Sequence, residues 1–137
     1  AKNNYDFMLI NFANADIVAH TGNEKATILA VETVDRCLGK IIPEILKKNG
    51  CLLITADHGN AEELRKRTTG ETDTEHSENP VPLWFVTADN NQKGAKEKFQ
   101  SYEAQGILSD VAPTILKLLG LEKPKDMTGE SLLPLLK

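Results

Sequence analysis

Apolar and polar positions alternate along the chain in blocks that predict strands and helices. Short apolar runs at Tyr5–Phe12, Cys51–Thr55 and Pro80–Val86 have the length and the branched or aromatic content of buried strands. From Glu24 onward, apolar residues recur with the period of a long helix, which Gly50 is expected to end. Strands that alternate with helices predict an α/β fold, with a mostly parallel sheet flanked by helices.

Shorter segments give weaker predictions. Asn60–Arg67 consists of good helix formers and predicts a short helix. Ser109 is a suitable N-cap for a helix over Val111–Leu119, and the tail GESLLPLLK predicts a last short helix. The polar segments between these elements are predicted to be loops: residues 13–23, 68–79 and 87–106.

Composition and charge narrow the class of protein. The chain has 137 residues, enough for one domain, and its 40% hydrophobic and 26% charged residues are typical of a soluble protein. No apolar run approaches the roughly 20 residues that a membrane span needs, and the first residues have no signal-peptide core. A net charge of −4 argues against a nucleic-acid surface. Cys37 and Cys51 are too few for a disulfide framework, so we expect buried thiols and a cytoplasmic location.

All three histidines fall beside the expected ends of strands. Asp16 and His20 follow the first predicted strand, Asp57 and His58 follow the second, and His76 precedes the third. Ligands of open α/β sheets gather at the carboxyl ends of the strands. The four-residue spacing of Asp16 and His20 would place both on one face of any helical turn there. Imidazole nitrogens and carboxylate oxygens together suit zinc, manganese or similar divalent ions, and five such residues suit two ions.

Each of these residues also has a structural explanation when it is taken alone. Asp16 fits a turn cap, and Asp57 fits the N-cap of the helix predicted from Asn60. A single histidine in a polar loop is usually a surface residue. The metal hypothesis therefore depends on the combination, and spacing alone leaves both interpretations open.

Four motifs add a family resemblance. NFANADIVAHTGN, LLITADHGNAEE, EHSENPVPL and LSDVAPTILKLLGL occur in an order and spacing that resemble the C-terminal part of cofactor-independent (2,3-bisphosphoglycerate-independent) phosphoglycerate mutases. These enzymes belong to the alkaline-phosphatase superfamily. The resemblance extends from about Tyr5 to Leu132 and therefore over nearly the whole chain.

The resemblance implies a centre with two manganese ions. Asp16, His20 and His76 would match the ligands of one ion, and Asp57 and His58 would match protein ligands of the other. Such enzymes interconvert 2- and 3-phosphoglycerate in glycolysis through a phosphoserine intermediate.

The aspartate and the nucleophilic serine that complete the family's second metal site have no match in this chain, and neither does the substrate-holding domain. Residues 1–137 are thus expected to be the C-terminal segment of a metal-binding phosphatase-like domain. We assign no catalytic residue to them and expect no activity from them alone.

Two alternatives remain beside this interpretation. The chain could belong to another enzyme of the alkaline-phosphatase superfamily, such as a phosphopentomutase or a metal-dependent phosphatase. It could also be a freestanding metal-binding or interaction module without catalysis.

Overall fold

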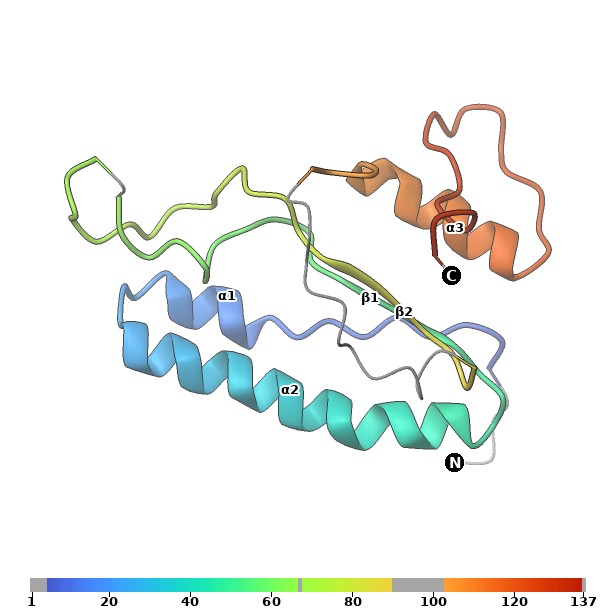
Figure 1. Ribbon diagram of the computed structural model, residues 1–137, viewed down its shortest axis with the longest axis horizontal. Helices are drawn as coiled ribbons and strands as arrows, with labels where there is room; N and C mark the ends of the chain where they lie inside the picture. Colours follow the sequence, from blue (N-terminus) through green and yellow to red (C-terminus); the bar gives the residue numbers. More distant parts are fainter. Residues whose placement is uncertain (1–4, 67, 90–102, 137) are drawn as a thin grey trace. The chain divides into compact units, whose positions relative to one another are not determined.

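The computed structural model describes residues 5–66, 68–89 and 103–136. The chain divides into two compact units, one of Asn11–Lys98 and one of Ala1–Ile10 with Phe99–Lys137. In chain order their elements are α1 (Asn14–Ala19), α2 (Glu24–Leu46), β1 (Leu52–Thr55), β2 (Leu83–Val86), the 3-10 helix η1 (Leu108–Asp110) and α3 (Val111–Leu118). Figure 1 labels the α-helices and the strands.

The long predicted helix is confirmed as α2. Asn23 caps its N-terminus: the side-chain Oδ1 accepts a hydrogen bond from the Ala26 backbone N–H at 3.1 Å and so satisfies a free donor of the first turn. The helix continues through Pro43 to Leu46. Its end is set by Asn49, which has a φ of 56° and turns the chain away from the helix axis.

Helix α1 occupies part of the segment predicted to be a loop, and it packs along the first half of α2 (Figure 1). The buried residues between the two helices are small: Ala19, Thr27 and Ala30. Asn14 Nδ2 donates to the Ala30 carbonyl at 3.1 Å and ties the two helices together. This packing fixes the position of Asp16, which lies in the first turn of α1.

Strands β1 and β2 form a two-stranded antiparallel sheet in which Leu52 pairs with Val86 and Thr55 pairs with Leu83. The mostly parallel sheet that we predicted is wrong for the described residues, although helices and strands are both present. Parallel strands need a crossover connection, usually a helix. The helix predicted at residues 60–67 would have supplied it, and residues 60–66 do not form one.

The chain between β1 and β2 doubles back as an irregular hairpin instead. Isolated bridges pair Gly59 with Ser77 and Arg65 with Thr72. The Ser77 N–H donates to the Gly59 carbonyl at 2.8 Å. Helix propensity is a weak preference that such tertiary hydrogen bonds override.

The other unit is organised around two polar residues. The Asp110 carboxylate accepts hydrogen bonds from the backbone N–H groups of Ile107 at 2.9 Å and Glu130 at 2.8 Å. The same two donors hold the pKa of Asp110 below its ordinary value, because they stabilise the carboxylate form. Fully buried Thr114 accepts from the Leu132 N–H at 2.8 Å. The tail is therefore held by partly buried hydrogen bonds to Asp110 and Thr114.

Three further predictions fail in the described residues. The tail forms turns rather than a helix, and Tyr5–Phe12 forms no strand. Helix α3 begins after η1 without a side-chain cap from Ser109. A strand needs a hydrogen-bonded neighbour as well as an apolar sequence, and residues 5–12 have no strand neighbour among the described residues. Most of the polar connection predicted at 87–106 lies outside the described residues.

Both cysteines have free thiols, and Cys51 is exposed rather than buried as expected. Of the helices that the structure describes, none is long and apolar enough to cross a membrane.

Candidate metal centre

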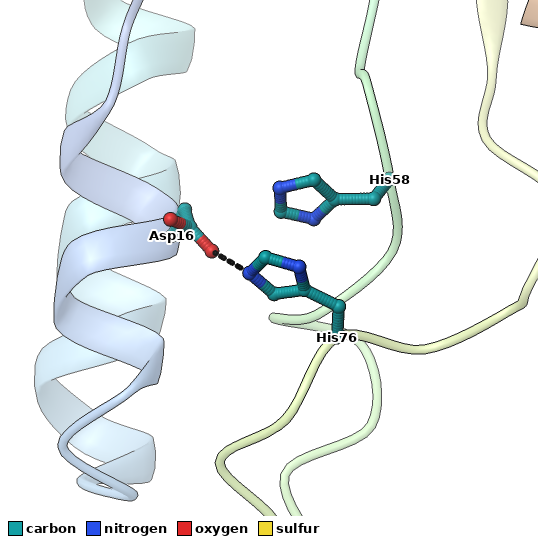
Figure 2. A group of neighbouring side chains, drawn as sticks. All are labelled: Asp16, His58 and His76. Carbon is teal, nitrogen blue, oxygen red and sulfur yellow. Dashed lines mark ion pairs between the residues drawn. The ribbon is translucent and has the colours of Figure 1, made fainter.

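Three segments of the Asn11–Lys98 unit bring metal-ligating side chains together. Figure 2 shows Asp16 on helix α1, facing the stacked imidazole rings of His58 and His76 from the two arms of the hairpin. One ligand atom from each of these three residues lies within 4.8 Å of the others. Asp16 and His58 are partly buried, whereas His76 is exposed.

The hairpin pairing explains why His58 and His76 stack. Gly59 pairs with Ser77 in antiparallel fashion, so His58 and His76 are diagonal neighbours on one face of the pair. Their ring centroids are 3.6 Å apart and the ring planes differ by 15°. Gly59 is buried at this bridge, where an added Cβ would collide with the Ser77 hydroxyl and the Glu62 carboxylate. A side chain at position 59 would therefore displace the Ser77 hydroxyl and the Glu62 carboxylate from their present positions.

His20 lies in the same cluster, one helical turn after Asp16. Its Nε2 atom is 3.2 Å from Asp16 Oδ1 and 3.2 Å from His76 Nε2. His76 Nε2 is 3.4 Å from Asp16 Oδ1. Three donor atoms, one oxygen and two nitrogens, thus face one another at similar separations.

A backbone carbonyl sets the orientation of His20. His20 Nδ1 lies 2.5 Å from the Thr74 carbonyl oxygen. A carbonyl only accepts, so Nδ1 carries the proton and the lone pair of a neutral His20 lies on Nε2, toward Asp16 and His76. This arrangement is the usual way in which proteins orient a histidine ligand for a metal.

Asp57 is the predicted site residue that does not join the cluster. Its side chain is 91% exposed, and Asp57 Oδ1 lies 3.7 Å from His58 Nε2. The structure thus brings Asp16, His20, His58 and His76 together and leaves Asp57 at the edge. The resemblance implies two ligand sets. The members of the first set, Asp16, His20 and His76, lie together in the structure. His58, which belongs to the second set with Asp57, lies beside them, stacked on His76.

The donor set fits a divalent transition metal. Ligand atoms about 2.0–2.1 Å from a tetrahedral ion lie about 3.4 Å from one another. The three separations among Asp16 Oδ1, His20 Nε2 and His76 Nε2 are 3.2, 3.2 and 3.4 Å. Carboxylate oxygen and imidazole nitrogen are ligands that zinc, manganese and cobalt all accept.

Sequence reasoning missed Asn60, which holds Asp16 in place. Asn60 Nδ2 donates to Asp16 Oδ1 at 2.8 Å, so this amide cannot be reversed without placing oxygen against oxygen. Asn60 is only 5% exposed, and its Oδ1 atom has no hydrogen-bond partner among the described residues. Leaving a buried acceptor unpaired costs free energy, so a bound group or a water molecule that donates to Asn60 Oδ1 would complete the site. The local sequence Asp-His-Gly-Asn contains no pattern that predicts a hydrogen bond from Asn60 to Asp16.

Sequence reasoning also missed Glu62, which binds both arms of the hairpin. Partial burial raises the pKa of its carboxyl, but hydrogen bonds from Ser77, Asn79 and the backbone outweigh this effect. The net result is a pKa lowered from 4.5 to about 2. The only clue in the sequence was a glutamate inside a segment predicted to be a helix.

The lowered pKa predicts an acid-dependent loss of stability. A carboxyl whose pKa is lowered in the folded state stabilises the fold at pH values above its pKa in the unfolded chain. This stabilisation is lost as the pH falls from 4.5 to about 2. Because Glu62 is exposed, solvent screening limits the contribution to about 1 kcal/mol. We expect Tm to fall less over this pH range in Glu62→Gln than in the original chain, as followed by circular dichroism. An equal fall in both proteins would contradict the expectation.

Comparisons with known proteins agree with a metal centre. The family model described as "Metalloenzyme superfamily" matches residues 1–123. Similar curated proteins are named "2,3-bisphosphoglycerate-independent phosphoglycerate mutase". The protein from Clostridium beijerinckii is 50% identical over 129 residues, 94% of this chain, and that from Clostridioides difficile is 49% identical over 132 residues, 96% of this chain.

A solved structure is also similar. It is a Leishmania mexicana phosphoglycerate mutase studied at low cobalt concentration, with a TM-score of 0.68, 34% identity and coverage of 88% of this chain. The chain spans about a quarter of the length of these relatives, 24% in each case. The family model, in contrast, matches most of the chain. On that match, the chain belongs to the Metalloenzyme superfamily.

Proposed function

We propose that this chain supplies the divalent-metal ligands of a 2,3-bisphosphoglycerate-independent phosphoglycerate mutase. Such an isomerase interconverts 2- and 3-phosphoglycerate, a cytoplasmic reaction of glycolysis, and residues 1–137 would correspond to its C-terminal part. The observation that carries the proposal is the convergence of Asp16, His20 and His76 at 3.2–3.4 Å. The names of the relatives supply the substrate class.

Five residues would hold two divalent ions, which we propose to be Mn²⁺. Asp16 contributes a carboxylate oxygen, and His20 and His76 contribute Nε2 nitrogens that already face it. His58, which stacks on His76, would serve the second ion together with Asp57. When bound, the ions would lower the pKa of a nucleophilic hydroxyl and neutralise the oxygens of a phosphoryl group.

The chain's own residues prepare this centre before any ion binds. The Thr74 carbonyl fixes the tautomer of His20, and the Asn60 amide holds Asp16 Oδ1. Preset ligands bind an ion more tightly because less conformational freedom is lost on binding. The Asp57 carboxylate is exposed and accepts no hydrogen bond from another described residue, so a second ion would be bound more weakly.

Titration with metal tests the proposal. The chain, first freed of metal with a chelator and then titrated calorimetrically with Mn²⁺ or Co²⁺ near pH 7.5, should bind one ion per chain in its stronger class. The ligand atoms of Asp16, His20 and His76 lie 3.2–3.4 Å from one another, close enough to share one ion, which is the reason for that stoichiometry. Lowering the pH should release the ion, because histidine must be neutral to act as a ligand. Absence of saturable binding at any neutral pH would contradict the proposal.

A further inference from the structure

One carboxylate outside the ligand set joins the two arms of the hairpin. Glu62 Oε1 accepts hydrogen bonds from the Ser77 hydroxyl and from Asn79 Nδ2, the latter at 2.9 Å. Glu62 Oε2 accepts from the Asn60 backbone N–H at 2.8 Å. Both oxygens are thus engaged, one by each arm of the hairpin.

The residues that Glu62 holds are neighbours of the proposed ligands. Ser77 directly follows His76 in the chain, and Asn60 lies two residues after His58. Since Asn60 Nδ2 also donates to Asp16 Oδ1 at 2.8 Å, the network extends to helix α1. Displacement of Glu62 would therefore loosen each of the three segments that carry ligands.

We propose that Glu62 is a positioning residue, whose carboxylate holds the His76 arm against the His58 arm and so sets the stacking of the two imidazoles. The consequence for metal binding rests on the proposed function, whereas the stacking itself does not. Glu62 is not one of the metal-ligating residues that gather around Asp16, and its two oxygens bind the arms of the hairpin instead.

Glu62→Gln is the sharpest substitution because it barely changes the shape of the side chain. Its amide has one oxygen and one NH₂ group, whereas the carboxylate serves donors on both sides. Either the Asn60 N–H or the Asn79 NH₂ group must then face another donor. One arm of the hairpin is released whichever way the amide turns.

The chain contains a matched control in Glu78. This glutamate lies between Ser77 and Asn79 in the same arm, is exposed, and has no hydrogen bond or ion pair with any other described residue. Glu78→Gln therefore removes the same charge from nearly the same place and leaves the network intact. Any general effect of charge on metal binding will appear in both variants.

The deciding measurement is the NMR spectrum of the imidazole C–H groups in the metal-free chain. Rings stacked at 3.6 Å shift each other's signals. We expect the His58 and His76 signals of Glu62→Gln to move toward their unfolded positions, and those of Glu78→Gln to stay. Unchanged signals in folded Glu62→Gln would overturn the proposal. If that variant does not fold, Ser77→Ala, which removes one donor and leaves Glu62, decides in the same way.

Cobalt binding gives the second measurement. Loss of an outer partner of a metal ligand typically weakens binding about 10- to 100-fold. Glu62 acts on the ligands through Asn60 and Ser77. We therefore expect a loss at the lower end of that range, about 10-fold, in Glu62→Gln, followed by the visible absorption of bound Co²⁺. The affinity of Glu78→Gln should equal that of the original chain. Failure of the original chain to bind Co²⁺ would count against the proposed function alone, because the imidazole signals still decide the role of Glu62.

Discussion

The 137-residue chain supplied with Mn²⁺ should convert 3-phosphoglycerate to 2-phosphoglycerate no faster than a protein-free control. The proposed reaction needs an activated nucleophile, and removal of a nucleophile can cost about 10⁶-fold in kcat. The measurement is a coupled assay that consumes 2-phosphoglycerate. A complete mutase, such as the Clostridium beijerinckii relative, serves as the positive control under the same conditions.

Ser77 is the serine nearest in sequence to a proposed ligand, and its environment does not activate it. Its hydroxyl donates to Glu62, whose pKa of about 2 makes that carboxylate too weak a base to accept the proton near neutral pH. We therefore expect Ser77→Ala to show the same background rate as the original chain. Turnover that persists through purification and disappears in Ser77→Ala would overturn this prediction.

Asp16→Asn should weaken the binding of Mn²⁺ or Co²⁺ by at least about 100-fold. Loss of a residue that is only hydrogen-bonded to a metal ligand already costs about 10- to 100-fold, and Asp16 is proposed to be a ligand itself. Asp16 Oδ1 faces both His20 Nε2 and His76 Nε2, at 3.2 and 3.4 Å. The asparagine keeps the size of the side chain and removes its charge. Calorimetric titration measures the affinity directly.

Asp57→Asn is the matched control for that measurement. It removes the same charge from the other predicted aspartate ligand, whose side chain is 91% exposed and lies 3.7 Å from His58. We expect the stronger binding event to be retained in this variant. If Asp57→Asn abolishes the stronger event and Asp16→Asn does not, the assignment of ligands to the stronger site is wrong.

The sequence by itself determined the elements whose signals are local. Helix α2 coincides with a segment of helical apolar period, and β1 and β2 coincide with short apolar runs bounded by polar residues. The sequence also singled out the histidines and aspartates as candidate ligands, because imidazole and carboxylate chemistry is independent of the fold.

Tertiary structure decided how those pieces are arranged. The segment from Asn60 has good helix formers, yet Asn60 and Glu62 use their hydrogen-bonding groups to hold other segments. Without a helix to cross over the sheet, the chain turns back as a hairpin, and β1 and β2 run antiparallel. Asp16 and Asp57 were equivalent candidates in the sequence. Only packing of α1 on α2 placed Asp16 among the imidazoles, while Asp57 stayed exposed. Hydrogen bonds between residues distant in the chain depend on the folded backbone, and a local sequence pattern carries no record of them.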